Sequence, residues 1–138
     1  MATREDARAA LTTRIEALKA VWSAYPLEIE YDNQNRVNPS TQVNPYLCVH
    51  LVWLDGYQVD LAQNPLHRVL GTIILEAKTK EGQGTKKALA LLDHFYEPLH
   101  MTDANTPLRT QAARFKTLEA KLGWATDAAI IPFWFDMS

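Results

Sequence analysis

RVLGTIILEAKTKEGQGTKKALALLDHF, residues 68–95, is the stretch that decides the fold of this chain. Apolar residues alternate through its first half and give way to charges, which predicts a strand over His67–Lys80. Gly82 and Gly84 then interrupt the pattern. The second half has apolar residues at helical spacing and predicts a helix over Thr85–Glu97, ended by Pro98. Its inward residues are expected to be Ala88, Leu91, Leu92 and Phe95.

The composition indicates one ordinary globular domain. The chain has 138 residues, of which 47% are hydrophobic and 22% charged, so a sizeable core is expected. A formal net charge of -2 argues against a broad electrostatic grip on nucleic acid. The single cysteine, Cys48, excludes an intrachain disulfide framework. Neither a membrane-spanning run nor a secretory signal is recognisable, so we expect a protein made in a cytoplasm, without a membrane partner.

The N-terminal region predicts a helix over residues 4–24. Thr3 is a candidate N-cap with Asp6 three positions on, and Pro26 is expected to stop the helix. Its apolar stripe consists of Leu11, Ile15, Leu18 and Trp22.

Strand signals follow this helix. Leu27–Tyr31 predicts a short strand, and the polar stretch Asp32–Asn44 predicts a functional or mobile loop. Tyr46–Leu54 is rich in β-forming residues, Asp55-Gly56 indicates a hairpin turn, and Tyr57–Leu61 is expected to pair back before a loop over residues 62–66.

The C-terminal third contains one ambiguous segment and one clear strand. Local spacing over residues 106–123 favours a helix, although Arg114–Leu118 also fits a strand. Asp127–Phe135 predicts a strand in which Pro132 indicates a sheet edge or a bulge. Ile130 and Trp134 would lie on its outer face, covered either by a helix or by an oligomer contact. The order of elements predicts an α+β domain: one mixed, mostly antiparallel sheet of four to five strands with two main helices packed on it.

Glu76 and Lys78 form a candidate active site. Alternation places both on one strand face, as in the Glu-x-Lys motif of Mg²⁺-dependent nucleases of the restriction-endonuclease type. Asp60 or Asp55 would complete the set. The simpler interpretation is that Glu76–Lys80 is the solvated end of an outer hairpin arm, and we favour it.

Other candidate sites are weaker. The segment Gly82–Lys86 lacks the ending and spacing of a phosphate-binding loop. The set Cys48, His50, His94 and His100 has no paired zinc-ligand spacing, and a Cys–His nucleophile would lack an orienting partner. We therefore expect no metal, no cofactor and no enzymatic activity.

Six segments follow one another in a recognisable order: Ile29–Asn33, Asn44-Pro45-Tyr46-Leu47, Arg68-Val69-Leu70-Gly71, the Gly84 turn before an Ala/Leu helix, Gly123-Trp124 and Ile130–Phe133. Together they resemble the phage tail terminator-like family, the group around minor tail protein U of siphophages. The resemblance spans most of the chain.

This resemblance implies a non-enzymatic assembly role in the virion tail. Members form a ring, typically a hexamer, that caps the tail tube, ends its growth and meets the head connector, while DNA passes as cargo. It also implies that residues 109–120 are extended, against their local pattern, and that the order of elements is α-β-β-β-α-β-β. The implied ring or tube contacts are Asn33, Asn35, Arg36, Asp55, Gln58, Asp60 and Arg68.

Overall fold

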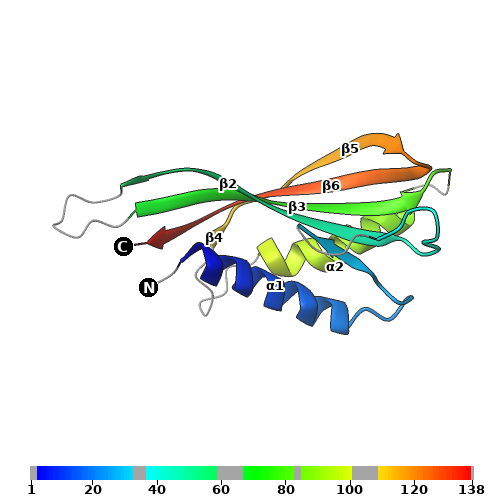
Figure 1. Ribbon diagram of the computed structural model, residues 1–138, viewed down its shortest axis with the longest axis horizontal. Helices are drawn as coiled ribbons and strands as arrows, with labels where there is room; N and C mark the ends of the chain where they lie inside the picture. The colour runs from blue at the N-terminus through cyan, green and yellow to red at the C-terminus, as the bar shows by residue number, and fades with distance from the viewer. Residues whose placement is uncertain (1–2, 33–36, 59–66, 83–84, 101–108, 138) are drawn as a thin grey trace.

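The computed structural model is an α+β domain, which confirms the predicted class (Figure 1). It describes residues 3–32, 37–58, 67–82, 85–100 and 109–137, with the backbone alone for Asp55 and residues 97–100. The elements in chain order are α1 (Arg4–Ala20), β1 (Ile29–Tyr31), β2 (Tyr46–Gln58), β3 (His67–Lys80), α2 (Lys86–His100), β4 (Arg109–Thr110), β5 (Arg114–Lys121) and β6 (Trp124–Met137).

Six strands in the described residues form one mixed sheet, one more than the upper predicted number. The order across the sheet is β1, β2, β3 and β6, and both β4 and β5 pair with the outer side of β6. Only β1 and β2 run parallel, and all other pairs are antiparallel, as predicted. The long strands β3 and β6 pair from His67–Met137 at one end to Lys80–Trp124 at the other.

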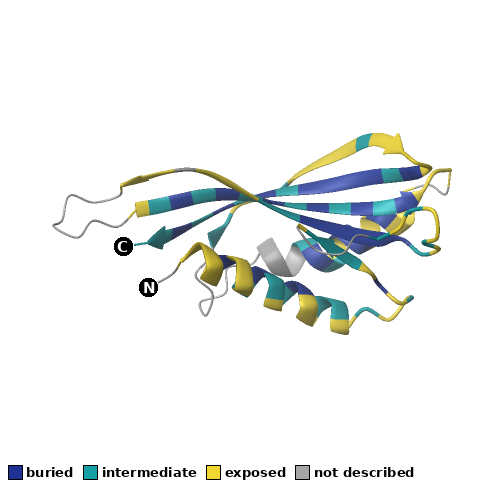
Figure 2. Ribbon diagram, viewed as in Figure 1, coloured by how far each residue is buried: buried dark blue, intermediate teal, exposed yellow. Residues whose placement is uncertain are grey.

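Both helices pack against one face of this sheet, which we call the covered face (Figures 1 and 2). Strand alternation gives that face nearly all of the apolar core, because every second residue of a strand points the same way. All four inward residues predicted for α2 are buried. The core residues from the sheet are Leu47, Val49, Val69, Ile73, Leu75, Ala77, Ala129, Ile131, Phe133 and Phe135.

The N-terminal cap of α1 is the predicted one, but the C-terminal ends of α1 and α2 both differ from the prediction. The Thr3 hydroxyl accepts the backbone N–H of Asp6, and the Asp6 carboxylate accepts that of Thr3, which forms a capping box. The α1 helix ends at Ala20, well before Pro26, and α2 continues past Pro98 to His100. No helix among the described residues is long and apolar enough to cross a membrane.

The predicted hairpin turn at Asp55-Gly56 is wrong. Strand β2 continues to Gln58, and the register shifts between Leu54 and Tyr57, so that Asp55 and Gly56 together oppose the single residue Val69 of β3 in a β-bulge. A Cβ on Gly56 would lie 2.3 Å from the carbonyl oxygen of Arg68, so the bulge requires glycine at this position. The expected strand over residues 57–61 and the loop over 62–66 fall mostly outside the described residues.

The helix predicted from local spacing over residues 106–123 is also wrong. Arg114–Lys121 forms strand β5, as the family resemblance implied, and pairs with β6. Leu122 and Gly123 both have positive φ, 54° and 80°, as a two-residue hairpin turn with right-handed twist requires. Pairing with the outer side of β6 therefore overrides the local helical pattern.

Pro132 lies inside β6, which is neither a sheet edge nor bulged at that residue. Its carbonyl oxygen accepts the backbone N–H of Gln111 at 2.9 Å. In an antiparallel strand the N–H and C=O of one residue point to the same side. The backbone N–H that Pro132 lacks would therefore point toward residues 111–113. These residues lie between β4 and β5 and form no regular strand.

Candidate assembly surface

The second face of the sheet, which we call the open face, has no helix packed on it among the described residues (Figure 1). At one end the chain around Val37 and Pro39 covers it, where the Trp124 indole donates to the Pro39 carbonyl at 3.0 Å. Elsewhere its large apolar side chains on β2, β3 and β6 are half-buried or exposed. They are Val52, Leu54, Tyr57, Leu70, Ile74, Ile130, Pro132 and Trp134.

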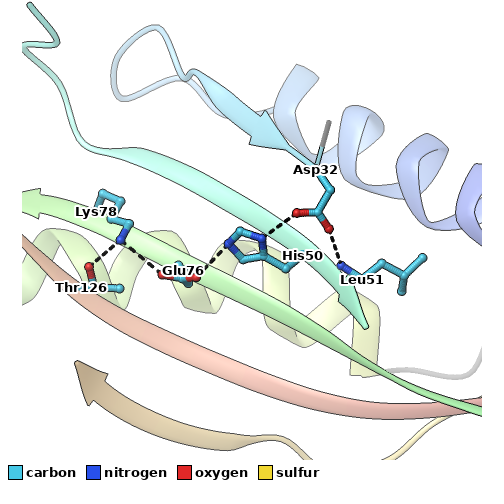
Figure 3. A network of polar contacts seen from close by, with 6 residues as sticks. All are labelled: Asp32, His50, Leu51, Glu76, Lys78 and Thr126. Carbon is cyan, nitrogen blue, oxygen red and sulfur yellow. Dashed lines mark hydrogen bonds and ion pairs between the residues drawn. The ribbon is translucent and has the colours of Figure 1, made fainter. Parts of the chain in front are cut away.

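The open face also holds a polar network centred on His50 of β2 (Figure 3). Its Nδ1 lies 2.8 Å from Oδ1 of Asp32, and its Nε2 lies 2.8 Å from Oε1 of Glu76. The second oxygen of Glu76 lies 3.2 Å from Nζ of Lys78, which donates to Thr126 at 2.8 Å. The network thus links the segment after β1 with β2, β3 and β6.

Two carboxylates around one imidazole favour the doubly protonated ring. The hydrogen bond with Glu76, joined by a second one with Asp32, raises the pKa of His50 to about 9 despite partial burial. The hydrogen bond from His50, together with the Lys78 charge, lowers the pKa of Glu76 to about 2. His50 is therefore a cation at neutral pH, held between two anions.

These pKa changes define a pH range in which the network stabilises the fold. The contribution of His50 is complete below its ordinary pKa of 6.5 and is lost as the pH rises through about 9. The contribution of Glu76 is present above its ordinary 4.5 and is lost as the pH falls through about 2. Both contributions are therefore complete between about pH 4.5 and 6.5.

We expect Glu76→Gln to lower the pKa of His50 from about 9 toward the ordinary 6.5, because a neutral amide replaces the carboxylate that stabilises the imidazolium. An NMR titration of the His50 ring protons measures this change. Lys78→Met is the matched control, since it removes a charge from the same network without touching His50 and should not lower the pKa. An unchanged His50 pKa in Glu76→Gln would contradict the network.

The charge run Glu76–Lys80 is not the solvated tip that the sequence suggested. Strand β3 lies between β2 and β6, and the side chains of Glu76 and Lys78 are only 16% and 22% exposed. Both oxygens of Glu76 already contact cations of this chain, so a metal ion would have to displace one of them. Asp60, the proposed third member of a nuclease site, lies outside the described residues.

The candidate zinc ligands are not brought together as a site. Cys48 is buried, and both ring nitrogens of His50 contact carboxylates. His94 lies on the opposite side of the sheet in α2, with Nε2 2.7 Å from the Leu18 carbonyl. Among the described residues, no group of three His, Cys, Asp or Glu side chains could hold a metal ion.

Arg68, predicted as an oligomer contact, binds within its own chain. Its Nε and Nη2 donate to the two oxygens of Asp136 at 2.9 and 3.1 Å. The guanidinium also lies 3.8 Å from the centre of the Trp134 ring, a cation–π contact. Arg68 therefore covers part of Trp134, and the rest of that residue contributes to the open face.

The structure describes only some of the other residues that were predicted to contact the ring or the tube. Asp55 lies in the bulge of β2, and Gln58, the last residue of β2, is exposed opposite His67. Arg68 follows on β3, so these three positions gather at one end of the sheet. Asn33, Asn35, Arg36 and Asp60 lie outside the described residues.

The sequence interpretation missed Asp32, His50 and Asp136 as partners in these networks. A weak signal existed for His50, because strand alternation puts it on the same face as Glu76 once the register of β2 and β3 is known. Asp32 gave no such signal, since it follows a three-residue strand whose parallel pairing with β2 is not encoded locally.

Comparison with known proteins supports the fold alone. No protein-family model and no curated protein sequence matches this chain. A solved structure whose name states no function matches with a TM-score of 0.68 and 14% sequence identity. The match covers 100% of this chain and 99% of the other, so the whole architecture is shared.

Proposed function

We propose that this protein is a phage tail terminator that caps the tail tube as a ring, ends its polymerisation and provides the surface that joins the head. The ordered sequence resemblance suggests this role, and the uncovered apolar stripe of the open face is the observation that carries it. A subunit that contacts its ring neighbours, the tube and the head must keep apolar surface available for these partners. The open face provides such a surface in the isolated chain.

The shape of the sheet supports the same proposal. The ends of β2 and β3 nearest residues 58 and 67, together with the end of β6 that pairs with β3, extend beyond the start of α1 as a three-stranded arm (Figure 1). An arm of this kind reaches a neighbouring subunit or the tube, and it carries Gln58 beside the intrachain pair of Arg68 and Asp136. The net charge of -2 suits a ring through which DNA passes without being held.

Deletion of the gene from its phage tests the proposed role. Electron microscopy should then show overlong tails or tails without heads, and the wild-type gene supplied in trans should restore the normal length. The purified protein should form a ring, alone or on addition of the tail tube protein, by light scattering and negative-stain microscopy. Virions of normal length and normal infectivity in the deletion strain would refute the role.

The nuclease alternative is distinguished by a separate assay. Wild-type protein is incubated with Mg²⁺ and single-stranded or duplex DNA, beside the Glu76→Gln and Lys78→Met variants. We expect no cleavage in any sample. Cleavage by the wild type that both variants lose would instead support the Glu-x-Lys nuclease, with Asp60 tested next.

A further inference from the structure

The outer side of β2 is paired over only a short part of its length. Strand β1 pairs with Leu47–Val49, and the Oδ2 atom of Asp32 then accepts the backbone N–H of Leu51 at 3.1 Å. Within the part of the chain that the structure describes, no strand lies beside the residues that follow. We call Val52–Tyr57 the outer edge of β2.

This edge is unusually apolar for an unpaired strand. The side chains of Val52, Trp53, Leu54 and Tyr57 are 40%, 36%, 52% and 52% exposed. Soluble proteins usually protect such edges with charges or proline, yet VWLDGY contains one charge, Asp55, and no proline. The bulge after Leu54 limits a regular ladder to the first three residues. A strand from another chain would pair there and cover the apolar side chains.

The opposite side of the sheet ends in β5, which pairs only with β6 among the described strands. Its residues Arg114–Thr117 are exposed, and Phe115 is 54% exposed. Three of its eight residues are basic, Arg114, Lys116 and Lys121. Like charges opposed across a junction disfavour pairing of β5 with a second β5. This edge therefore suits a partner strand of different composition.

We infer that the outer edge of β2 pairs with β5 of a second copy of this chain, so that the sheets of neighbouring subunits join edge to edge. This inference deepens the proposed ring and rests on it, because it names the two surfaces that such a ring would join. The contact is heterologous, because it joins two different edges of the same sheet. Such contacts form a closed ring when the rotation from each subunit to the next adds up to a full turn.

The directions and faces of the strands agree with this junction. Strands β2, β3, β6 and β5 alternate in direction, so β5 of a neighbour placed beside β2 is antiparallel to it. Phe115 pairs with Ala129 and Trp53 with Gly71, which places both aromatic side chains on the covered face. Val52 and Leu54 lie on the open face with Arg114 and Lys116, whose aliphatic stems can cover them.

Disulfide trapping tests the pairing directly. In a Cys48→Ala background, Val52→Cys and Lys116→Cys chains are oxidised separately and as a mixture, and the products are separated by non-reducing electrophoresis. The mixture should give a covalent dimer, and a chain carrying both substitutions should give a ladder of larger products. A dimer from Val52→Cys alone would show symmetric pairing of two β2 edges and overturn the inference, as would a mixture without product. Val43→Cys, at a 72% exposed position, replaces Val52→Cys as the matched control.

Sedimentation of chains that retain Cys48 provides a second measurement. Val52→Lys should weaken self-association at least about tenfold, because it places charge in the apolar contact, while Val43→Lys should leave association unchanged and both should keep the wild-type circular dichroism. A wild-type chain that stays monomeric alone and with tube protein, or unchanged association in Val52→Lys, would overturn the inference.

The two proposals can fail separately. If a ring forms but the β2–β5 cross-link does not, the proposed junction is wrong and the terminator function is unaffected. If the cross-link forms but the deletion strain makes normal tails, the junction is supported and the proposed terminator function is wrong.

Discussion

Gly71→Val is expected to lower the free energy of unfolding by about 3 kcal/mol, the upper end of what overpacking a core usually costs. Gly71 is a buried residue of β3 on the covered face. A Cβ built there would lie 2.3 Å from Cζ of Phe133 and 2.9 Å from the backbone oxygen of Val52. The ring of Phe133 would have to leave its site, and the strand β2 cannot move away without breaking its ladder with β3.

Urea unfolding followed by circular dichroism measures this loss. Thr72→Val, one residue further on the open face, is the matched control and should stay within about 1 kcal/mol of the wild type. In a Gly71→Ala chain, a second change, Phe133→Leu, should cost less than it does in the wild type, because it removes the ring that the new methyl group meets. A Gly71→Val chain as stable as the wild type would show that this site is not closely packed.

Phe95→Ala should lower the free energy of unfolding by about 3–5 kcal/mol, because it leaves a cavity under the sheet. Phe95 is 0% exposed on α2 and belongs to the same core as Ile131, Phe133 and Phe135. The loss of this side chain removes contacts between α2 and the covered face.

Leu89→Ala on the same helix is the matched control for Phe95→Ala. Leu89 is 51% exposed, so its truncation should change the free energy of unfolding by less than about 0.5 kcal/mol. Thermal and urea unfolding of the two variants measure the difference. Equal losses in both would mean that α2 does not pack through its Phe95 face.

Strong periodic patterns predicted the central elements of the fold. The bounds of β3 are those expected from alternation, and all four inward residues of α2 are buried. The Thr3 capping box was also readable, because its two partners are three residues apart. In each case the structural cause lies within one element, where the sequence records it directly.

Elements that depend on a distant partner were not predictable from local pattern. Residues 114–121 have helical apolar spacing, yet hydrogen bonds to β6 make them a strand. Asp55-Gly56 is a frequent turn sequence, but pairing with β3 continues past it and turns it into a bulge. The His50 network needs the register of three strands at once, which no local rule supplies.

The two contacts of Asp32 have a consequence for the length of the sheet edge. One oxygen accepts the Leu51 N–H that a longer β1 would otherwise bind, so this carboxylate ends the parallel pairing of β1 with β2. The other oxygen contacts the His50 imidazole, which holds the Asp32 carboxylate in this position while the imidazole is charged. Asp32 thus sets how many residues of β2 remain unpaired among the described strands, and these are the residues that the proposed junction between subunits uses.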